Sequence, residues 1–326
     1  MATLSIGTAV LQGAGRAHGY LKVGDMPDGR SMQIPVLLAR GDRPGPTLWL
    51  HGCVHGNEAC GAFVVHQLLR DLDTAALSGT VVGLPILNIT AFRSKARMSP
   101  FEGFAGGDLN RCFPGKADGT LTEQMAHTIY TELKAHATHL IDLHTAMTAD
   151  VRWALFPNAG GDVGAQSEAM ARAFGFTSTL PAPMDILGGS AMMVAARDRI
   201  PGLIVEAGGK GPAFTATLVS EVVDRLRNVM RQLGMLQGAV TPSGPLTYFS
   251  NFAWVRAVQG GLFQRAVHCG ERVKVGTVLG HYWDLWGQPT GEAVSTHAGV
   301  VLAIHPGPLM ASGETLVHIG LDPREV

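Results

Sequence analysis

Two side chains that could hold a metal ion, His55 and Glu58, lie in the glycine-containing turn that follows an apolar run at residues 48–50. The run is typical of a buried strand, and a helical pattern begins just after the pair, near Ala59. In an α/β sheet, ligands bind beyond the carboxyl ends of the strands, so this turn could direct an imidazole and a carboxylate to one point. Both groups are zinc ligands, and a catalytic zinc keeps three protein ligands and one open position. Taken alone, the pair is more often a capping Glu beside a structural His.

Two later apolar runs also end in polar side chains. Residues 140–145 predict a short buried strand on which Asp142 and His144 share one face, because side chains alternate along a strand with a period of two. Residues 202–209 repeat this pattern, and their last polar side chain is Glu206. His144 is therefore the candidate third metal ligand, whereas His139 lies at the start of its strand and on the other face.

Regular periodicity disappears between residues 90 and 120, a stretch rich in Gly, Arg and Pro. A loop of this length inside a compact domain is usually functional. It contains Arg93 and Arg97, followed by the polar run Asp108-Leu109-Asn110-Arg111. Thr120 and Glu123 then form a capping-box pattern, which predicts a helix that runs to about residue 136.

The elements that must position these residues are strands at 34–38, 47–50 and 80–89 and helices at 59–72, 166–174 and 213–233. Glycines, prolines and a serine gather at residues 237–245, which indicates a domain boundary. Short strands separated by glycine turns follow it. We therefore expect a catalytic domain at residues 1–240 and a small all-β domain at residues 241–326.

Composition bounds the class of protein. The chain has 326 residues, of which 46% are hydrophobic, and a formal net charge of −1. This balance offers no excess of positive charge for nucleic acid or for an anionic membrane. The N-terminal residues show no signal-peptide pattern, and no apolar run reaches the roughly 20 residues needed to span a bilayer. The four cysteines form no C-x-x-C pair, which favours a reducing, cytoplasmic location.

The ordered motifs His55-Gly56-Asn57-Glu58, Asp108-Leu109-Asn110-Arg111, Asp142-Leu143-His144 and Glu206 resemble those of the succinylglutamate desuccinylase/aspartoacylase family. This family belongs to the zinc carboxypeptidase-like superfamily. The resemblance covers roughly the whole chain, and the broad bacterial deacylase branch fits best, because Asn88-Ile89 stands where aspartoacylases usually have Asn-Pro. It implies an α/β fold with a mixed sheet flanked by helices. It also implies that the C-terminal β domain is a lipoyl/biotinyl-like half-barrel.

The resemblance further implies a role for each candidate residue. One zinc ion per chain would be bound by His55, Glu58 and His144, and Glu206 would be the catalytic carboxylate. Asp108 would hold His55 in the correct tautomer; the alternative is an Asp that caps a turn. Arg97 matches the arginine that stabilises the oxyanion, and Arg93 competes for this role because the loop spacing varies. Asn110 and Arg111 resemble the pair that binds a substrate carboxylate, whereas an internal salt bridge is the alternative for Arg111.

The expected function is zinc-dependent hydrolysis of the amide bond of a small N-acylated, carboxylate-bearing substrate by a metal-activated water, with Glu206 as base and then acid. A metallocarboxypeptidase is the alternative, since Asn110 and Arg111 would serve a peptide C-terminus equally well. A non-enzymatic binding protein is disfavoured, because the three ligand types and Glu206 are all present. The sequence leaves open which acyl group and amine are used, and whether the chain forms a homo-oligomer. Arg256 or Tyr282 could reach the substrate from the C-terminal part, although structural roles suit both better.

Overall fold

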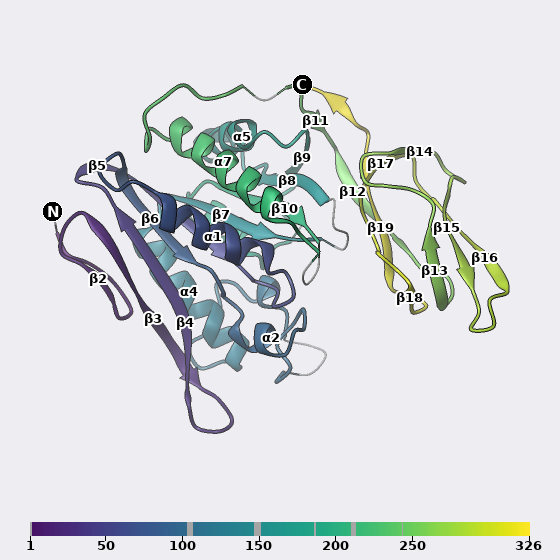
Figure 1. The fold of residues 1–326 in the computed structure, drawn as a ribbon, viewed down its shortest axis with the longest axis horizontal. Coiled ribbons are helices and arrows are strands. Elements are labelled where there is room, and N and C mark those ends of the chain that lie inside the picture. The colour runs from purple at the N-terminus through teal and green to yellow at the C-terminus, as the bar shows by residue number, and fades with distance from the viewer. Residues whose placement is uncertain (1, 103–106, 147–150, 186, 210–212, 243) are drawn as a thin grey trace.

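A mixed sheet of ten strands forms the centre of the larger part of the molecule in the computed structural model (Figure 1). The structure describes residues 2–102, 107–146, 151–185, 187–209, 213–242 and 244–326. The order of the strands across the sheet is β20-β11-β9-β8-β10-β7-β5-β6-β4-β3. Their bounds are β3 Gly15–Asp25, β4 Ser31–Arg40, β5 Arg43–Gly52, β6 Ser78–Leu84, β7 His139–His144, β8 Val151–Pro157, β9 Ser178–Ala182, β10 Gly202–Gly208, β11 Thr247–Tyr248 and β20 Arg324–Glu325. The strands β6, β5, β7 and β10 are parallel neighbours, whereas β8 runs antiparallel to β10.

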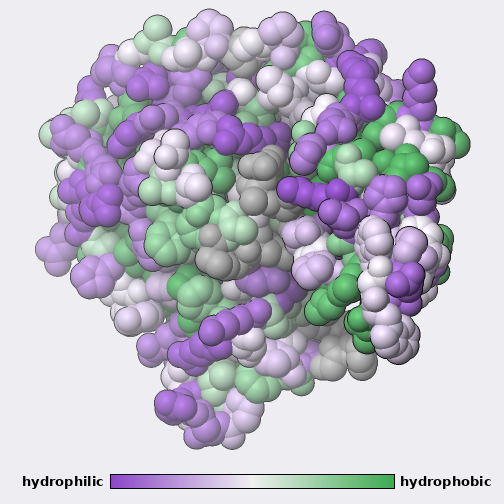
Figure 2. Space-filling view, turned by 45° about the vertical axis from the view of Figure 1, so that its right-hand side comes forward, coloured by the Kyte–Doolittle hydropathy of each residue, from purple (hydrophilic) through white to green (hydrophobic). Residues whose placement is uncertain are grey.

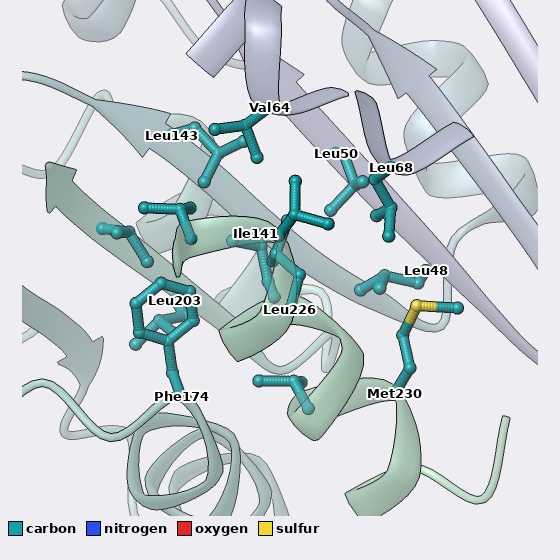
Figure 3. Packing of buried hydrophobic residues seen from close by; sticks show 14 of the residues in the cluster. Leu48, Leu50, Val64, Leu68, Ile141, Leu143, Phe174, Leu203, Leu226 and Met230 are labelled. Atoms are coloured by element: carbon teal, nitrogen blue, oxygen red, sulfur yellow. The ribbon is translucent and has the colours of Figure 1, made fainter. Parts of the chain in front are cut away.

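Helices cover both faces of this sheet. Their bounds are α1 Cys60–Asp71, α2 Ile89–Arg93, α4 Leu121–His136, α5 Gly161–Phe174, α6 Ala191–Arg197 and α7 Ala216–Gln232, together with a 3-10 helix, η1, at Leu109–Arg111. Side chains of α1, α5 and α7 pack on Leu48, Ile141 and Leu203 of the sheet (Figure 3). Side chains of α4 and α6 pack on the opposite face, against Trp49 and Leu140. The result is a three-layer α/β domain, in agreement with the expected fold class.

Alternation along the strands decides which residues reach the second face. In β7, Ile141 and Leu143 belong to the core under α1 and α7, so Asp142 and His144 point the other way. In β10, Leu203 and Val205 share that core, and Glu206 therefore lies on the same side of the sheet as His144. Hydrocarbon side chains on one face thus fix where the polar side chains on the other face must lie.

The C-terminal part is all β, as expected. It consists of two four-stranded sheets, with orders β12-β19-β17-β14 and β16-β15-β13-β18. The strands span β12 Asn251–Arg256, β13 Gly261–Arg265, β14 Arg272–Val273, β15 Val278–Trp283, β16 Pro289–Val294, β17 Gly299–Ile304, β18 Leu309–Met310 and β19 Thr315–Leu321. A separate apolar core, which includes Leu279, Tyr282 and Ile319, lies between the sheets. At the N-terminus, β1 Leu4–Ile6 and β2 Ala9–Leu11 form a small hairpin.

Capping residues recognised in the sequence predicted the start of α4 and the end of α5 correctly. The capping box of Thr120 and Glu123 is present at the start of α4, and Gly175 ends α5 in the left-handed conformation. Other ends differ from expectation. The strand expected to reach residue 89 ends at Leu84, and α7 begins after Thr215, whose side chain caps it. The stretch at 90–120, expected to lack regular structure, contains most of α2 and all of η1.

The surface mixes hydrophilic and hydrophobic residues over the face that Figure 2 shows. None of the helices in the described ranges combines the length and hydropathy that a bilayer crossing requires.

Candidate active site

Three side chains that could bind a metal converge where β5 and β7 end. His55 and Glu58 lie between β5 and α1, and His144 is the last residue of β7. The Nδ1 atom of His55 lies 2.9 Å from Oε1 of Glu58, and Nδ1 of His144 lies 3.1 Å from Oε2 of Glu58. One ligand atom from each residue lies within 4.8 Å of the others, and all three residues are buried. The structure thus brings together the three ligands that the sequence proposed.

A second carboxylate contacts each imidazole ring, Asp108 at His55 and Asp142 at His144. Nε2 of His55 is hydrogen-bonded to Oδ1 of Asp108 at 3.1 Å, and Nε2 of His144 lies 3.1 Å from Oδ2 of Asp142. Such partners fix the tautomer and leave the other ring nitrogen for a metal. Nδ1 of His55 is buried and faces Oε1 of Glu58, so a metal would satisfy this polar nitrogen. The donor set of two imidazoles and one carboxylate fits a zinc ion.

The ionic groups around Glu58 determine how easily it ionises. Burial opposes ionisation, but the positive charge of His55, hydrogen bonds from His144 and His55, and the charge of Arg97 outweigh it and hold the pKa of Glu58 well below its usual value. Burial likewise opposes ionisation of Asp108, yet its hydrogen bond to His55 leaves the Asp108 pKa lowered. Both carboxylates are therefore anionic at neutral pH, as metal binding requires.

Of the two competing arginines, the structure brings Arg97 to the site. Nη1 of Arg97 donates to Oε1 of Glu58 at 2.7 Å, and the residue lines the cavity over the ligands. Arg93 lies at the end of α2, is exposed, and is not among the described residues that line this cavity. The peptide N–H of Gly56 also donates to the carbonyl of Arg97 at 3.3 Å, which ties this loop to the metal-ligand turn.

Glu206 lies one strand away from His144. The two residues are register partners in the parallel pair β10 and β7, so both side chains point into the same cavity. Oε2 of Glu206 is enclosed and has no hydrogen-bond partner. Burial raises the pKa of Glu206 to about 8, and the nearby negative charges of Glu58 and Asp142 add to this effect, whereas His144 and Arg97 oppose it. A carboxyl group with such a pKa can take up and release a proton near neutral pH.

Asn110 and Arg111 line the same cavity from η1. Asp108 orients them, because its Oδ1 accepts a hydrogen bond from the peptide N–H of Asn110 at 3.0 Å. Asp108 therefore caps the turn and also contacts His55. Nη1 of Arg111 donates to the carbonyl of Asn110 at 2.9 Å, and Arg111 forms no ion pair with another described residue.

The cavity has a volume of about 370 Å³, and the C-terminal β domain forms one of its walls. The described residues of this wall are Phe252, Trp254, Arg256, His305, Glu314, Thr315 and His318. Arg256 therefore reaches the cavity, whereas Tyr282 is fully buried in the core of the β domain. The rest of the lining that the sequence did not predict is Ala146, Trp153, Leu155, Leu187 and Ile204.

Asp142 and His51 are two buried polar residues near the site that sequence reasoning left without a role. Oδ1 of Asp142 lies 3.9 Å from Nδ1 of His51, and both side chains are completely buried. Burial lowers the pKa of His51 to about 4, against the opposing charge of Asp142, so His51 is neutral. The signal for Asp142 was present in the sequence, because it shares a strand face with His144.

Comparison with known proteins identifies the family. A family model described as the succinylglutamate desuccinylase/aspartoacylase catalytic domain matches residues 44–233. The chain belongs to this family. The resemblance found in the ordered motifs is thereby confirmed.

Members of the succinylglutamate desuccinylase/aspartoacylase family resemble the chain over nearly its full length. The chain is 29% identical over 294 residues to the N-alpha-acetyl-L-2,4-diaminobutyric acid deacetylase of Halomonas elongata. This alignment covers 85% of the chain and 83% of the relative. The product-bound ectoine utilization protein EutE (DoeB) from Ruegeria pomeroyi superposes with a TM-score of 0.84 at 27% identity, over 95% of this chain and 96% of the other. A succinylglutamate desuccinylase/aspartoacylase from Rhodobacter sphaeroides gives 0.82 at 25% identity, over 96% of each chain.

Proposed function

We propose that the protein is a zinc-dependent hydrolase that cleaves the amide bond of a small N-acyl amino acid. The observation that carries the proposal is the cluster of His55, Glu58 and His144, with Glu206 on the neighbouring strand. The deacetylase from Halomonas elongata, which is similar over most of the chain, supports an amide substrate.

His55, Glu58 and His144 would hold a divalent metal, which would supply a Lewis acid and lower the pKa of a water molecule towards neutrality. The carboxylate of Glu206 accepts a proton from the attacking water, whose oxygen forms a bond to the amide carbon. Nη1 of Arg97 donates a hydrogen bond to Glu58. The other N–H groups of the Arg97 guanidinium can donate to the carbonyl oxygen of the substrate amide as it becomes negative.

Glu206 then gives its proton to the nitrogen as the C–N bond breaks. The products are a carboxylic acid and a free amine. A positioned carboxyl group can act first as base and then as acid. Arg111 and the buried Asn110 would bind the substrate carboxylate and so place the amide beside Glu206.

The wall formed by the C-terminal domain favours a small molecule over a peptide. Phe252, Trp254 and Arg256 of β12 line the cavity opposite the sheet. A cavity of about 370 Å³ accommodates a compact acyl amino acid, whereas a polypeptide would need an open groove.

The test is hydrolysis of a panel of N-acetyl, N-succinyl and longer N-acyl amino acids, with dipeptides and longer peptides alongside. We expect amine release from N-acyl amino acids that stops on chelation and returns with zinc. Cleavage of peptides alone would show a carboxypeptidase. Failure to hydrolyse any member of the panel after zinc loading would overturn the proposal.

A further inference from the structure

The register of three strands arranges the cavity floor in rows. His144 of β7, Glu206 of β10 and Trp153 of β8 are register partners, and all three line the cavity. The next row pairs Ile204 of β10 with Leu155 of β8. Neighbouring strands lie roughly 4.8 Å apart. Across this short distance the lining side chains change from His144, a candidate metal ligand, to Glu206, the candidate proton carrier, and then to the apolar Trp153.

The two ends of the cavity therefore differ in chemistry. One end lies near His55 and carries Arg97, Asn110 and Arg111. The other end, here called the apolar end, lies beyond Glu206. Its described lining belongs to one apolar cluster and carries no charge; it consists of Ala146, Trp153, Leu155, Leu187, Ile204 and Phe252.

Two basic side chains of the β domain that line the cavity, Arg256 and His318, are engaged with aromatic rings. Arg256 lies four residues along β12 from Phe252. Its guanidinium is 5.9 Å from the centre of the Trp254 ring, and its Nη1 donates to the carbonyl of Gly313. His318 packs its ring against Phe252, with the ring centres 5.8 Å apart.

The position of the scissile bond decides which part of the substrate meets each end. The amide carbon must lie between the His55, Glu58 and His144 cluster and Glu206. If the carboxylate of the amino acid is bound by Arg111, the acyl group on the other side of the carbonyl extends past Glu206 towards Trp153 and Leu155. This orientation rests on the proposed function.

We propose that the apolar end binds the acyl group and that the enzyme selects uncharged acyl groups over dicarboxylic ones such as succinyl. A carboxylate placed against Leu155, Ile204 and Phe252 would lose its hydration without gaining a cationic partner. A hydrocarbon group of the same shape would instead bury apolar surface. Succinyl and 4-methylpentanoyl groups make this comparison directly, because the isopropyl end of the second has nearly the shape of the carboxylate of the first.

The first experiment measures kcat/KM for the acetyl, 4-methylpentanoyl and succinyl derivatives of one amino acid with the zinc-loaded enzyme. We expect 4-methylpentanoyl to exceed succinyl by at least about 100-fold. Equal rates, or a preference for succinyl, would overturn the inference but leave the deacylase function standing. Cleavage of the acetyl derivative alone would show that this end holds no longer acyl chain, and would also overturn it. Hydrolysis of none of the three would instead refute the proposed function.

The second experiment uses a matched pair of variants. Leu155 and Leu180 are register partners on β8 and β9 and are 2% and 0% exposed, but only Leu155 lines the cavity. Leu155→Ala should lower the kcat/KM ratio of 4-methylpentanoyl to acetyl about tenfold, because the longer acyl group loses the hydrocarbon it packs against, and Leu180→Ala should leave it unchanged. The ratio is independent of how much enzyme is folded, because both substrates meet the same active fraction. The same change in both variants, or no change in Leu155→Ala, would refute the assignment.

Discussion

Replacing Glu206 with Gln tests both the electrostatics and the chemistry of the site. The amide has nearly the same shape and cannot ionise. In the metal-free protein, burial raises the pKa of Glu206 from its usual 4.5 to about 8. The folded protein therefore keeps this proton up to about pH 8, whereas the unfolded chain releases it near pH 4.5. The stability contributed by this group is fully present below pH 4.5 and is lost as the pH rises to 8.

The size of this loss follows from the two pKa values. At about 1.4 kcal/mol for each pKa unit, the whole interval corresponds to about 5 kcal/mol, of which about 4 kcal/mol falls between pH 5 and pH 9. The Gln variant lacks this contribution. The free energy of unfolding of the wild type, minus that of Glu206→Gln, should therefore fall by about 4 kcal/mol across this range.

The assay is urea unfolding of the chelated proteins at several pH values, with Glu325→Gln as the control, since Glu325 is exposed. A difference that stays flat between pH 5 and pH 9 would show that Glu206 is not held protonated by its surroundings. In the zinc-loaded enzyme the same variant should keep its metal and lose about 10²- to 10⁴-fold in kcat. Loss of zinc would make Glu206 a ligand, and near-normal turnover would remove it from the mechanism.

Three further predictions concern the metal and the substrate. Replacing His55, Glu58 or His144 with alanine should abolish zinc binding that survives dialysis against a chelator. The control is His139→Ala, on the same strand as His144, which should retain the zinc. Asp142→Asn should weaken zinc affinity by about 10- to 100-fold in a competition assay, because the His144 ring loses the carboxylate that orients it; an unchanged affinity would deny Asp142 this role. Arg111→Ala should raise KM for carboxylate substrates and leave kcat nearly unchanged, and an unaltered KM would place the carboxylate elsewhere.

The three candidate ligands could be predicted from the sequence because each lies at the end of an easily recognised strand or in the turn after it. Apolar runs end just before His55 and at His144 and Glu206, and parallel strands bring such ends to one edge of a sheet. The assignment of Asp108 followed from the resemblance alone. Its two hydrogen bonds, to His55 and to the peptide N–H of Asn110, became visible only with side-chain positions.

The apolar end could not be predicted in this way. Trp153 and Leu155 lie in the middle of β8, and they reach Glu206 and Ile204 only because β8 runs antiparallel to β10 in a particular register. Register between strands distant in sequence depends on tertiary packing and not on local pattern. The same holds for Phe252, which reaches the cavity through the packing of the C-terminal domain.

The short helix α2 and the start of α5 escaped prediction for a different reason. The helix α2 has five residues, too few to show a periodicity, and isolated helices of this length are unstable in water. The helix α5 begins at Gly161 after a glycine that provides no capping side chain, so only its end at Gly175 could be recognised.

The most direct test of the central claim is a zinc titration of the chelated protein, followed by amine release from an N-acetyl amino acid. The proposed site predicts activity that rises linearly and stops at one zinc per chain, with no such rise in the His144→Ala variant. Full activity of the metal-free protein, or a zinc response that survives the loss of His144, would contradict the assignment of this cluster as the catalytic metal site.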